Sequence, residues 1–356
     1  MRVTLGDVCE KGSSNLKQSD VINKTGAYPI YGAAGYLGNV DFYHQDKPYV
    51  AVVKDGAGIG RTTLHPAKSS VIGTMQYLLP KSNVLPEYLY YVVQYMHLEK
   101  YFTGATIPHI YFKDYKAEQF NLDAMERQKE IVASLQKVET LIKVRQQQLQ
   151  KLDELVKARF VEMFGDCKSM VSMNELCSII TDGTHQPPRF QESGIPFIFV
   201  SNLVGNVVTY NAEKFISEDT YAELYKRTPI EIGDLLLSTV GSYGHPAVVT
   251  EDRKFLFQRH IAYLKPRHNM VNSFYLHSAL LAPDGQRQIE EKVKGIAQKT
   301  LNLSEIKKIA VPLPTIEEQN QFEKFVNQTD KSKVAVQKSL DEAQLLFDSL
   351  MQQYFG

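Results

Sequence analysis

The sequence predicts an α+β protein with an internal repeat: two mixed α/β globular domains joined by two long antiparallel α-helices that pair like a coiled coil. Two observations predict this fold class. Residues 104–165 align without a gap to residues 295–356, and each segment ends in a long stretch with helical spacing of apolar residues. The prediction includes approximate two-fold symmetry between the copies.

The repeat is weak in identity, but it keeps one register throughout. Ten of the 62 aligned positions are identical at a shift of 191 residues. Further upstream the copies resemble each other more faintly, as in "TLGDVC" (4–9) and "SMNELC" (172–177). This pattern predicts a duplicated chain. The identical pairs are Gly104/Gly295, Lys116/Lys307, Leu122/Leu313, Glu126/Glu317, Gln128/Gln319, Gln146/Gln337, Leu149/Leu340, Leu155/Leu346, Phe164/Phe355 and Gly165/Gly356.

Each copy contains signals for the start of a long helix. Asp123 with Glu126, and Thr315 with Glu318, have the spacing of a capping box. Neither predicted helix contains Gly or Pro between its cap and its final glycine, so each is expected to run for about 40 residues, or roughly 60 Å. The first copy carries a heptad-like apolar stripe. Its residues are Ile131, Leu135, Val138, Ile142, Leu149, Leu152, Val156, Phe160 and Met163.

A helix of this length with one apolar stripe needs a partner, and the other copy is the simplest one. Because the second globular half begins soon after Gly165, the first helix must lead away from the first half and the second must return. The pair is therefore predicted to be antiparallel. The predicted boundaries are 1–122 and 166–313 for the globular domains, and 123–165 and 314–356 for the helices.

The segment "VVKDGAGIG" (52–60) has two interpretations. A glycine-rich loop after a strand can bind a phosphate or a nucleoside cofactor, but such a loop needs a following helix and commonly an acidic residue about 20 positions later. The sequence has no Asp or Glu from Arg61 through Pro86. The other copy has "LLSTVGSYGHPAVV" (236–249) at this place, which retains a turn but loses the glycine spacing. A hairpin turn is therefore predicted.

Composition restricts the class of protein. The 356 residues include 43% hydrophobic and 22% charged residues, which is typical of a globular protein. There is no apolar run long enough for a membrane helix, and no signal peptide, so a cytoplasmic location without a membrane partner is predicted. The three cysteines and nine histidines form no metal-binding spacing. The formal net charge of zero gives no electrostatic signature of a protein that binds nucleic acid alone.

No catalytic motif is recognisable. The segment "HQPPRF" (185–190) faintly resembles the Asn/Asp-Pro-Pro-aromatic motif of amino-methyltransferases, but Arg189 occupies the aromatic position, and a loop stiffened by prolines is the simpler interpretation. No nucleophile elbow or Walker loop is present. The sequence therefore predicts no catalytic, cofactor-binding or metal-binding residue.

Polar and aromatic residues on loops punctuated by Gly and Pro are the remaining candidates for function. Most of the twenty tyrosines are expected to be buried. On loops, however, Arg can contact guanine, Asn or Gln can contact adenine, and aromatic rings can stack. The candidate DNA-binding residues are Tyr31, Tyr36, Lys54, Arg61, Thr106, His109, Thr184, His185, Gln186, Arg189, Tyr243, His245, Arg259 and Lys299.

Several segments in this order resemble the specificity subunit of a type I restriction-modification enzyme. They are "YPIYGAAGYLG" in the first half, and "TDGTHQPPRF…GIPFIFVSNLVG", "GDLLLSTVGSYG" and "VPLPTIEEQNQF" in the second. The last of these resembles the Pro-Leu-Pro…Glu-Gln sequence at which a helix of that family begins. The first copy has "FNLDAMERQKEI" there, without the prolines but with Glu126 and Gln128. The resemblance covers essentially the whole chain.

The resemblance implies two target-recognition domains, each of which recognises one half of a split sequence in double-stranded DNA. It implies that two methyltransferase subunits dock on the helices, which also act as a spacer, and that restriction subunits that cut DNA using ATP join the complex. The chain itself would be non-catalytic. S-adenosylmethionine, ATP and Mg would bind to the partner subunits, and no cofactor would bind to this chain.

Two alternative functions come from other classes. One is a self-contained DNA methyltransferase in which the glycine-rich segment binds S-adenosylmethionine. The other is a coiled-coil scaffold protein with no role at DNA.

Overall fold

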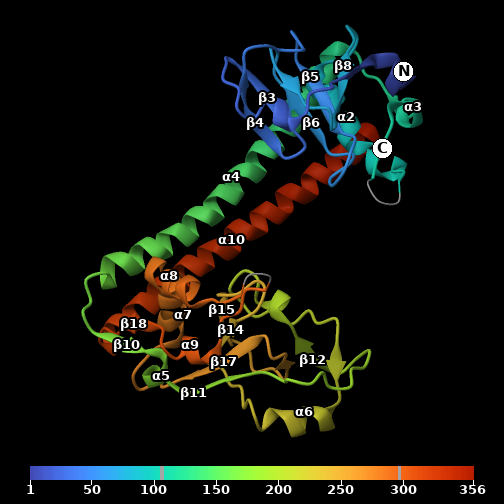
Figure 1. Cartoon of the computed structure of the whole chain (residues 1–356). Helices are drawn as coiled ribbons and strands as arrows, with labels where there is room; N and C mark the ends of the chain where they lie inside the picture. The colour runs from blue at the N-terminus through green and yellow to red at the C-terminus, as the bar shows by residue number, and fades with distance from the viewer. Residues whose placement is uncertain (105–107, 296–297) are drawn as a thin grey trace. The chain divides into compact units, whose positions relative to one another are not determined.

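The computed structural model describes residues 1–104, 108–295 and 298–356. The chain forms two units. Unit 1 comprises Met1–Gln146 and Lys338–Gly356, and unit 2 comprises Gln147–Gln337. Each unit contains one globular domain and a part of each long helix (Figure 1).

The domain of unit 1 is built on an antiparallel four-stranded sheet with the order β2-β8-β5-β6, beside a three-stranded sheet with the order β4-β3-β7. Helix α2 packs on the larger sheet. The strands are β1 (Arg2–Thr4), β2 (Cys9–Ser13), β3 (Tyr28–Gly32), β4 (Gly35–Val40), β5 (Tyr49–Val53), β6 (Thr62–His65), β7 (Ser70–Val71), β8 (Met75–Pro80) and β9 (Gln119–Asn121). The helices are α1 (Leu5–Val8), η1 (Gln18–Asp20), α2 (Pro86–Tyr95), η2 (Leu98–Tyr101) and α3 (Phe112–Tyr115).

The domain of unit 2 repeats this plan. Its four-stranded sheet has the order β11-β17-β14-β15, beside a sheet with the order β13-β12-β16. The strands are β10 (Met170–Ser172), β11 (Cys177–Asp182), β12 (Ile195–Ile198), β13 (Phe215–Ile216), β14 (Leu235–Ser238), β15 (Pro246–Val248), β16 (Leu256–Phe257), β17 (Ile261–Pro266) and β18 (Ala310–Pro312). The helices are α5 (Met173–Leu176), η3 (Val200–Leu203), α6 (Glu218–Tyr225), α7 (Ser273–Leu281), α8 (Pro283–Lys292) and α9 (Leu303–Ile306).

The structure confirms the predicted fold class and its repeat. In each domain the first and last strands pair, as β1 with β9 and as β10 with β18. Isolated backbone bridges also recur at the shift of 191 residues, since Thr103 pairs with His109 and Lys294 pairs with Thr300. The same scaffold is therefore present twice.

One inner strand of each four-stranded sheet, β5 or β14, is buried on both faces, which explains its largely apolar sequence. In β5, Val50 and Val52 belong to the hydrophobic cluster that includes α2. Tyr49, Ala51 and Val53 belong to a second cluster on the opposite face. Strand β14 likewise divides its leucines between two clusters.

The glycine-rich segment is part of a β-hairpin, as the sequence predicts. It connects β5 to β6, which pair in antiparallel fashion, and the loop between β14 and β15 takes the same place in unit 2. Gly60 has a φ of +82°, and a Cβ added there would lie 2.6 Å from the backbone nitrogen of Glu99. Glycine at this position therefore serves a tight turn against a neighbouring segment.

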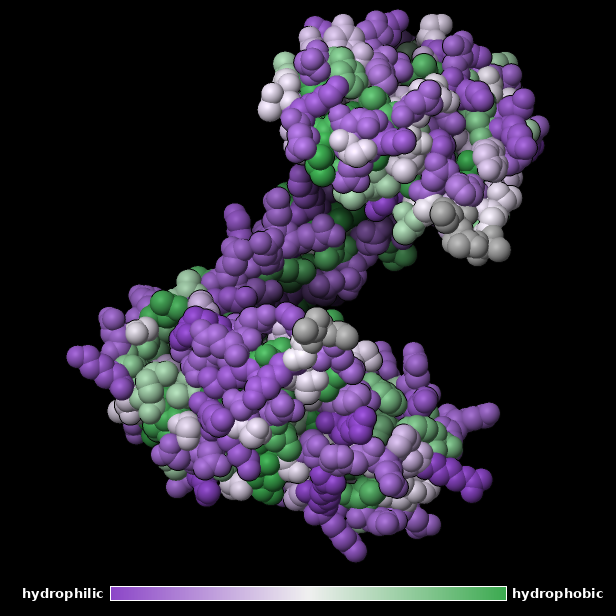
Figure 2. Space-filling model, in the orientation of Figure 1, coloured by the Kyte–Doolittle hydropathy of each residue, from purple (hydrophilic) through white to green (hydrophobic). Residues whose placement is uncertain are grey.

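The long helices are α4 (Met125–Phe164) and α10 (Ile316–Phe355), each of 40 residues. They pack antiparallel within each unit. In unit 1, Ile131 and Leu135 near the start of α4 share a buried cluster with Met351 near the end of α10. In unit 2, the rings of Phe160 and Phe322 lie 5.5 Å apart. Figure 2 shows that hydrophilic residues cover most of the outer surface of the helices.

One of the two predicted capping boxes is correct. Thr315 precedes α10, and its backbone nitrogen and hydroxyl both donate to Glu318 Oε2 at 2.9 Å. The box at Asp123 and Glu126 is wrong, because α4 begins at Met125 and the position that matches Thr315 is Ala124. The Asp123 carboxylate instead accepts a hydrogen bond of 2.8 Å from the Tyr88 hydroxyl.

A buried glutamine joins the start of α4 to the domain of unit 1. The Gln128 side chain is 0% exposed. Its Nε2 donates to the carbonyl oxygens of Asn83 at 3.0 Å and Asp123 at 2.9 Å. Its Oε1 accepts from the backbone nitrogen of Leu85 at 2.9 Å, directly before α2. The glutamine therefore links two chain segments through three hydrogen bonds.

The same junction recurs in unit 2. Gln319 is also 0% exposed, and its Nε2 donates to the carbonyl oxygens of Met270 at 3.2 Å and Pro314 at 3.0 Å. Its Oε1 accepts from the backbone nitrogen of Asn272 at 2.8 Å, directly before α7. The pair Gln128/Gln319 is thus identical in sequence because both residues perform the same structural task.

Each domain also packs against the C-terminal end of the second long helix, which is α10 in unit 1 and α4 in unit 2. The ring of Phe355, at the end of α10, lies 5.4 Å from the ring of Tyr88 in α2. The ring of Phe164, at the end of α4, lies 5.0 Å from the ring of Tyr275 in α7. Each domain is therefore packed against the start of one helix and the end of the other.

Candidate nucleic-acid interface

The loop between β11 and β12 in unit 2 carries four of the candidate residues. Together with the end of α6 it lines a concave surface of about 420 Å³. Pro187 and Pro188 restrict the backbone of this loop. Gly183, the first residue of the loop, lies close to β16. A Cβ at this position would lie 2.2 Å from the Phe257 carbonyl oxygen, so only glycine fits here. The candidate residues on this surface are Thr184, His185, Gln186 and Arg189.

Asp182 organises the charges around this surface. Its Oδ1 lies 2.6 Å from Arg227 Nη2, and its Oδ2 lies 2.9 Å from His185 Nε2. Arg189 is exposed, and within the described ranges of the chain it makes no hydrogen bond or ion pair. Arg189 therefore offers a cation that the protein leaves without a counter-charge.

Arg227, which also lines this surface, is not among the residues predicted from the sequence. A basic residue directly after a helix is usually explained by the helix dipole, so the pair Lys226 and Arg227 gave no reason to expect a contact elsewhere. The ion pair joins residues 45 positions apart. Only the fold brings the end of α6 to the loop.

A second group of candidates lies on the loop between β14 and β15 and on the segment after α8. Lys299 Nζ lies 3.2 Å from the Tyr243 hydroxyl and 3.0 Å from Glu290 Oε1. Hydrogen bonds from Tyr243 and Lys299 lower the pKa of Glu290, and Glu290 in turn raises the pKa of Lys299. Lys299 is thus a positively charged group that is partly neutralised by Glu290.

Backbone hydrogen bonds connect these two groups through the turn that contains Arg259. The Arg259 nitrogen donates to the Thr184 carbonyl oxygen at 3.1 Å, and the Thr239 nitrogen donates to the His260 carbonyl oxygen at 2.9 Å. The Gly241 nitrogen donates to the Lys299 carbonyl oxygen at 3.2 Å. Backbone hydrogen bonds therefore hold these loops of unit 2 next to one another.

His245 belongs elsewhere. Its Nδ1 lies 3.1 Å from Asn206 Oδ1, and its backbone nitrogen donates to Ser238 Oγ at 2.9 Å. The structure thus ties His245 to the segment that follows η3, and not to Tyr243 and Lys299.

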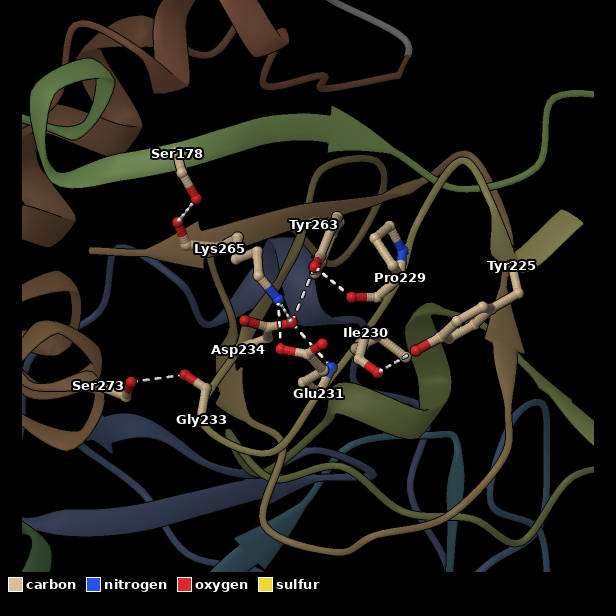
Figure 3. Close-up of polar contacts among 10 residues, drawn as sticks. All are labelled: Ser178, Tyr225, Pro229, Ile230, Glu231, Gly233, Asp234, Tyr263, Lys265 and Ser273. Atoms are coloured by element: carbon tan, nitrogen blue, oxygen red, sulfur yellow. Dashed lines mark hydrogen bonds and ion pairs between the residues drawn. The ribbon is translucent and has the colours of Figure 1, made fainter. Parts of the chain in front are cut away.

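A buried polar cluster lies at the start of β14, at the opposite end of this strand from the loop that carries Tyr243 (Figure 3). Asp234 is 1% exposed, and its Oδ2 accepts from the Tyr263 hydroxyl and from the Glu231 nitrogen, both at 2.8 Å. Lys265 Nζ lies 3.4 Å from the same oxygen and 2.8 Å from Glu231 Oε2. Burial raises the pKa of Asp234, although these hydrogen bonds oppose the shift. These contacts hold the turn before β14 in place. Strand β14 is followed by the loop that carries Tyr243.

In unit 1, one group of candidates lies where two hairpins meet. Arg61 Nη2 donates to the Ala33 carbonyl oxygen at 2.7 Å, which joins the loop after β5 to the turn between β3 and β4. The rings of Tyr31 and Tyr36 lie 6.0 Å apart beside this contact, and Tyr36 is 62% exposed. Tyr31, Tyr36 and Arg61 therefore share one surface.

A second group in unit 1 surrounds Asp55. Its Oδ2 lies 2.5 Å from Lys54 Nζ, and its Oδ1 lies 2.7 Å from His109 Nδ1. The backbone nitrogen of Gly56 donates to the Pro108 carbonyl oxygen at 3.0 Å, which brings the segment before α3 to the same hairpin loop. The remaining candidate, Thr106, lies outside the described residues.

Within residues 1–104, 108–295 and 298–356, no group of three or more His, Cys, Asp or Glu side chains could hold a metal ion. None of the helices in the same ranges is long and apolar enough to cross a membrane.

Comparisons with known proteins agree with this architecture. The family described as "Type I restriction modification DNA specificity domain" matches residues 1–154 and 169–343. The EcoBI specificity subunit of Escherichia coli is 31% identical over 170 residues, which are 48% of this chain and 36% of that protein. The putative MjaX specificity subunit of Methanocaldococcus jannaschii is 22% identical over 189 residues, or 51% of this chain and 44% of that protein.

The matched stretches thus span less than half the length of these two relatives. A solved structure agrees over a longer range: the S subunit of a type I restriction-modification system from M. genitalium superimposes with a TM-score of 0.60. The superposition covers 100% of this chain and 96% of that subunit at 15% sequence identity, so it shows the same fold. Because the family match includes both halves of the duplicated chain, the protein belongs to the type I restriction-modification DNA specificity family.

Proposed function

We propose that this chain is the DNA sequence-recognition subunit of a type I restriction-modification complex, and that each domain recognises one half of a bipartite target. One observation carries the proposal: the same scaffold occurs twice, but it presents different residues on its loops. Unit 1 exposes Tyr36 and Arg61, whereas unit 2 exposes Gln186 and Arg189. Two domains with different loops can recognise two different half-sites.

The chemistry of the loops supports DNA as the target. Arginine binds the O6 and N7 atoms of guanine with two hydrogen bonds, and glutamine can bind adenine in the same way. Arg189 and Gln186 lie on one concave surface with Arg227. His185 and Thr184 line the same surface and are suited to contact phosphates, which fix the position of the protein on the duplex. The complex would act in the cytoplasm on double-stranded DNA.

The long helices are the proposed docking site for two methyltransferase subunits. Leu155 on α4 and Leu346 on α10 are one of the identical pairs of the repeat, and they are 47% and 48% exposed. A leucine that the fold leaves exposed in both copies is suited to an interface with a partner. The complex would also include restriction subunits. S-adenosylmethionine, ATP and Mg would bind to these partners, and this chain would be non-catalytic.

Neither alternative function gains support. The glycine-rich segment of the methyltransferase hypothesis is a hairpin between antiparallel strands. The scaffold hypothesis gives no reason for two domains with the same fold and different polar loops.

Exchange of residues 170–310 for the matching domain of another family member tests the proposal directly. The exchange should change one half of the methylated DNA sequence and leave the other half unchanged, because each domain recognises its half alone. Sequencing of methylated DNA from cells that carry the exchanged gene measures both halves. A change in both halves, or in neither, would contradict independent recognition.

At least one of the variants Arg189→Ala and Arg61→Ala should weaken binding of the complex to its target. An arginine that contacts a base should cost about 1–3 kcal/mol on removal and relax one position of the target, whereas one that contacts a phosphate should weaken all sequences alike. Binding titrations on the target and on single-base variants separate the two. Arg287→Ala is a matched control, because Arg287 pairs with Asp284 and Glu291 within α8. Full affinity in both variants would disprove the assignment.

Leu155→Asp and Leu346→Asp should each weaken association with the methyltransferase subunit by tenfold or more. A buried leucine contributes about 1.5–3 kcal/mol, and about 1.4 kcal/mol corresponds to a factor of ten. Both leucines are exposed in the free chain, so folding should change little. Gln147→Asp, at an exposed polar position of α4, controls for the added charge. Titration by analytical ultracentrifugation gives the affinities, and equal affinity in all variants would place the interface elsewhere.

A further inference from the structure

Unit 2 contains a cavity that the proposed function does not use. It has a volume of about 400 Å³ and lies between α7, the end of α4, the start of α10 and the segment 205–208. Its lining includes apolar side chains and several charged ones. The residues that matter most to its chemistry are Val156, His277, Ser278, Asp330 and Lys333.

The repeat allows the cavity to be compared with the matching place in unit 1. Helices α2 and α7 correspond residue by residue, because Leu85 and Asn272 donate to the two buried glutamines in the same way. This correspondence matches Tyr91 with Ser278.

The long helices correspond at the shift of 191 residues. That shift matches Glu139 with Asp330, and Phe347 with Val156. Three residues that line the cavity therefore have known counterparts in unit 1.

Unit 1 fills the matching place with its own aromatic rings. Tyr91 is 1% exposed, and its hydroxyl donates to Glu139 Oε2 at 2.6 Å. The ring of Tyr91 lies 6.3 Å from the ring of Phe347. A phenol ring with its hydroxyl on a carboxylate therefore completes the packing of this place in unit 1.

In unit 2 both large side chains are replaced by small ones, Ser278 and Val156, while the carboxylate remains as Asp330. Replacing two rings by small side chains opens space that the surrounding structure closes only partly. The cavity thus contains the Asp330 carboxylate, which corresponds to the Glu139 carboxylate that accepts from the Tyr91 hydroxyl in unit 1. It contains no ring in the place of Tyr91.

The other residues that line the cavity provide an apolar surface for a ring and polar groups beside it. Phe160, Val326 and Leu281 provide apolar walls. Lys333 Nζ lies 2.8 Å from Asp153 Oδ1 and 3.1 Å from Asp330 Oδ1, which keeps the carboxylates paired with a cation. His277 Nε2 faces the Asn206 carbonyl oxygen at 3.0 Å, and burial lowers the pKa of His277. The His277 side chain therefore adds an uncharged imidazole to the lining of the cavity.

We propose that this cavity binds a phenol ring, with the hydroxyl of the ring donating to Asp330 as Tyr91 donates to Glu139. The ring can come from a free phenolic compound or from a tyrosine side chain of a partner protein, and both have the same chemistry. The site is independent of DNA recognition, because it lies against the long helices and shares no lining residue with the concave surface around Arg189.

The test uses p-cresol, the side-chain analogue of tyrosine, and the full chain. Ligand-observed NMR and calorimetry should show saturable binding at one site. Toluene has the same ring without the hydroxyl, and it should bind about tenfold more weakly because the hydrogen bond to a carboxylate is lost. Absence of saturable p-cresol binding would overturn the proposal.

Variants that restore the rings of unit 1 provide the control. Ser278→Tyr fills the cavity from α7, and Val156→Phe fills it from α4, so each should reduce p-cresol binding by at least about tenfold. Two variants are used so that a folding defect in one, detected by circular dichroism, leaves the other informative. The reverse change, Tyr91→Ser, should create a second p-cresol site in unit 1. Undiminished binding in both filled variants would show that p-cresol binds elsewhere.

Addition of the methyltransferase subunit distinguishes the two sources of the ring. Competition between that subunit and p-cresol would identify the natural ligand as a side chain of the partner. Continued p-cresol binding in the complex would identify it as a free phenolic compound. Both results support the site. The DNA sequence that is methylated should stay unchanged in Ser278→Tyr, so failure of the proposed function and failure of this site give different results.

Discussion

The buried glutamine at the start of each long helix is the contact on which the rest of the structure depends. Buried backbone N–H and carbonyl groups in the loops that precede helices need hydrogen-bond partners, because the helix itself does not supply them. Gln128 and Gln319 each satisfy two carbonyl oxygens and one N–H group from segments far apart in the sequence. A wrong side chain would leave these buried groups unpaired, at a cost of about 1–3 kcal/mol for each.

The aromatic contacts at the opposite ends of the helices complete this arrangement. Phe355 packs on Tyr88, and Phe164 packs on Tyr275, so each domain holds one helix start and one helix end. The two domains therefore present equivalent attachment points. An equivalent scaffold with different loops is the physical basis on which the proposed recognition of two half-sites rests, because the loops can vary while the junctions stay the same.

The fold followed from the sequence because its strongest signals are local or repeated. The shift of 191 residues and the helical spacing of apolar residues need no knowledge of the tertiary structure. The capping box predicted at Asp123 is absent, because α4 begins at Met125 and the Asp123 carboxylate accepts a hydrogen bond from the hydroxyl of Tyr88, 35 residues away. The spacing of residues in the sequence does not show whether a side chain from a distant segment will bind a predicted capping residue.

The candidate interface was only partly predictable for the same reason. Residue types on loops indicated Thr184 and Arg189, but the contribution of Arg227 depends on where α6 ends in space. The cavity of unit 2 also escaped prediction. The difference between Tyr91 and Ser278 acquires meaning only when the junctions show that the two residues occupy the same place.

Hydrogen exchange in Gln128→Met and Gln319→Met variants tests the central role of the glutamine junctions most directly. Methionine has a similar size but forms none of the three hydrogen bonds. Gln128→Met should reduce the protection of backbone amides in strand β5 by roughly tenfold or more and leave strand β14 unchanged, and Gln319→Met should do the reverse. Unchanged protection in the substituted unit, or equal losses in both units, would contradict the account.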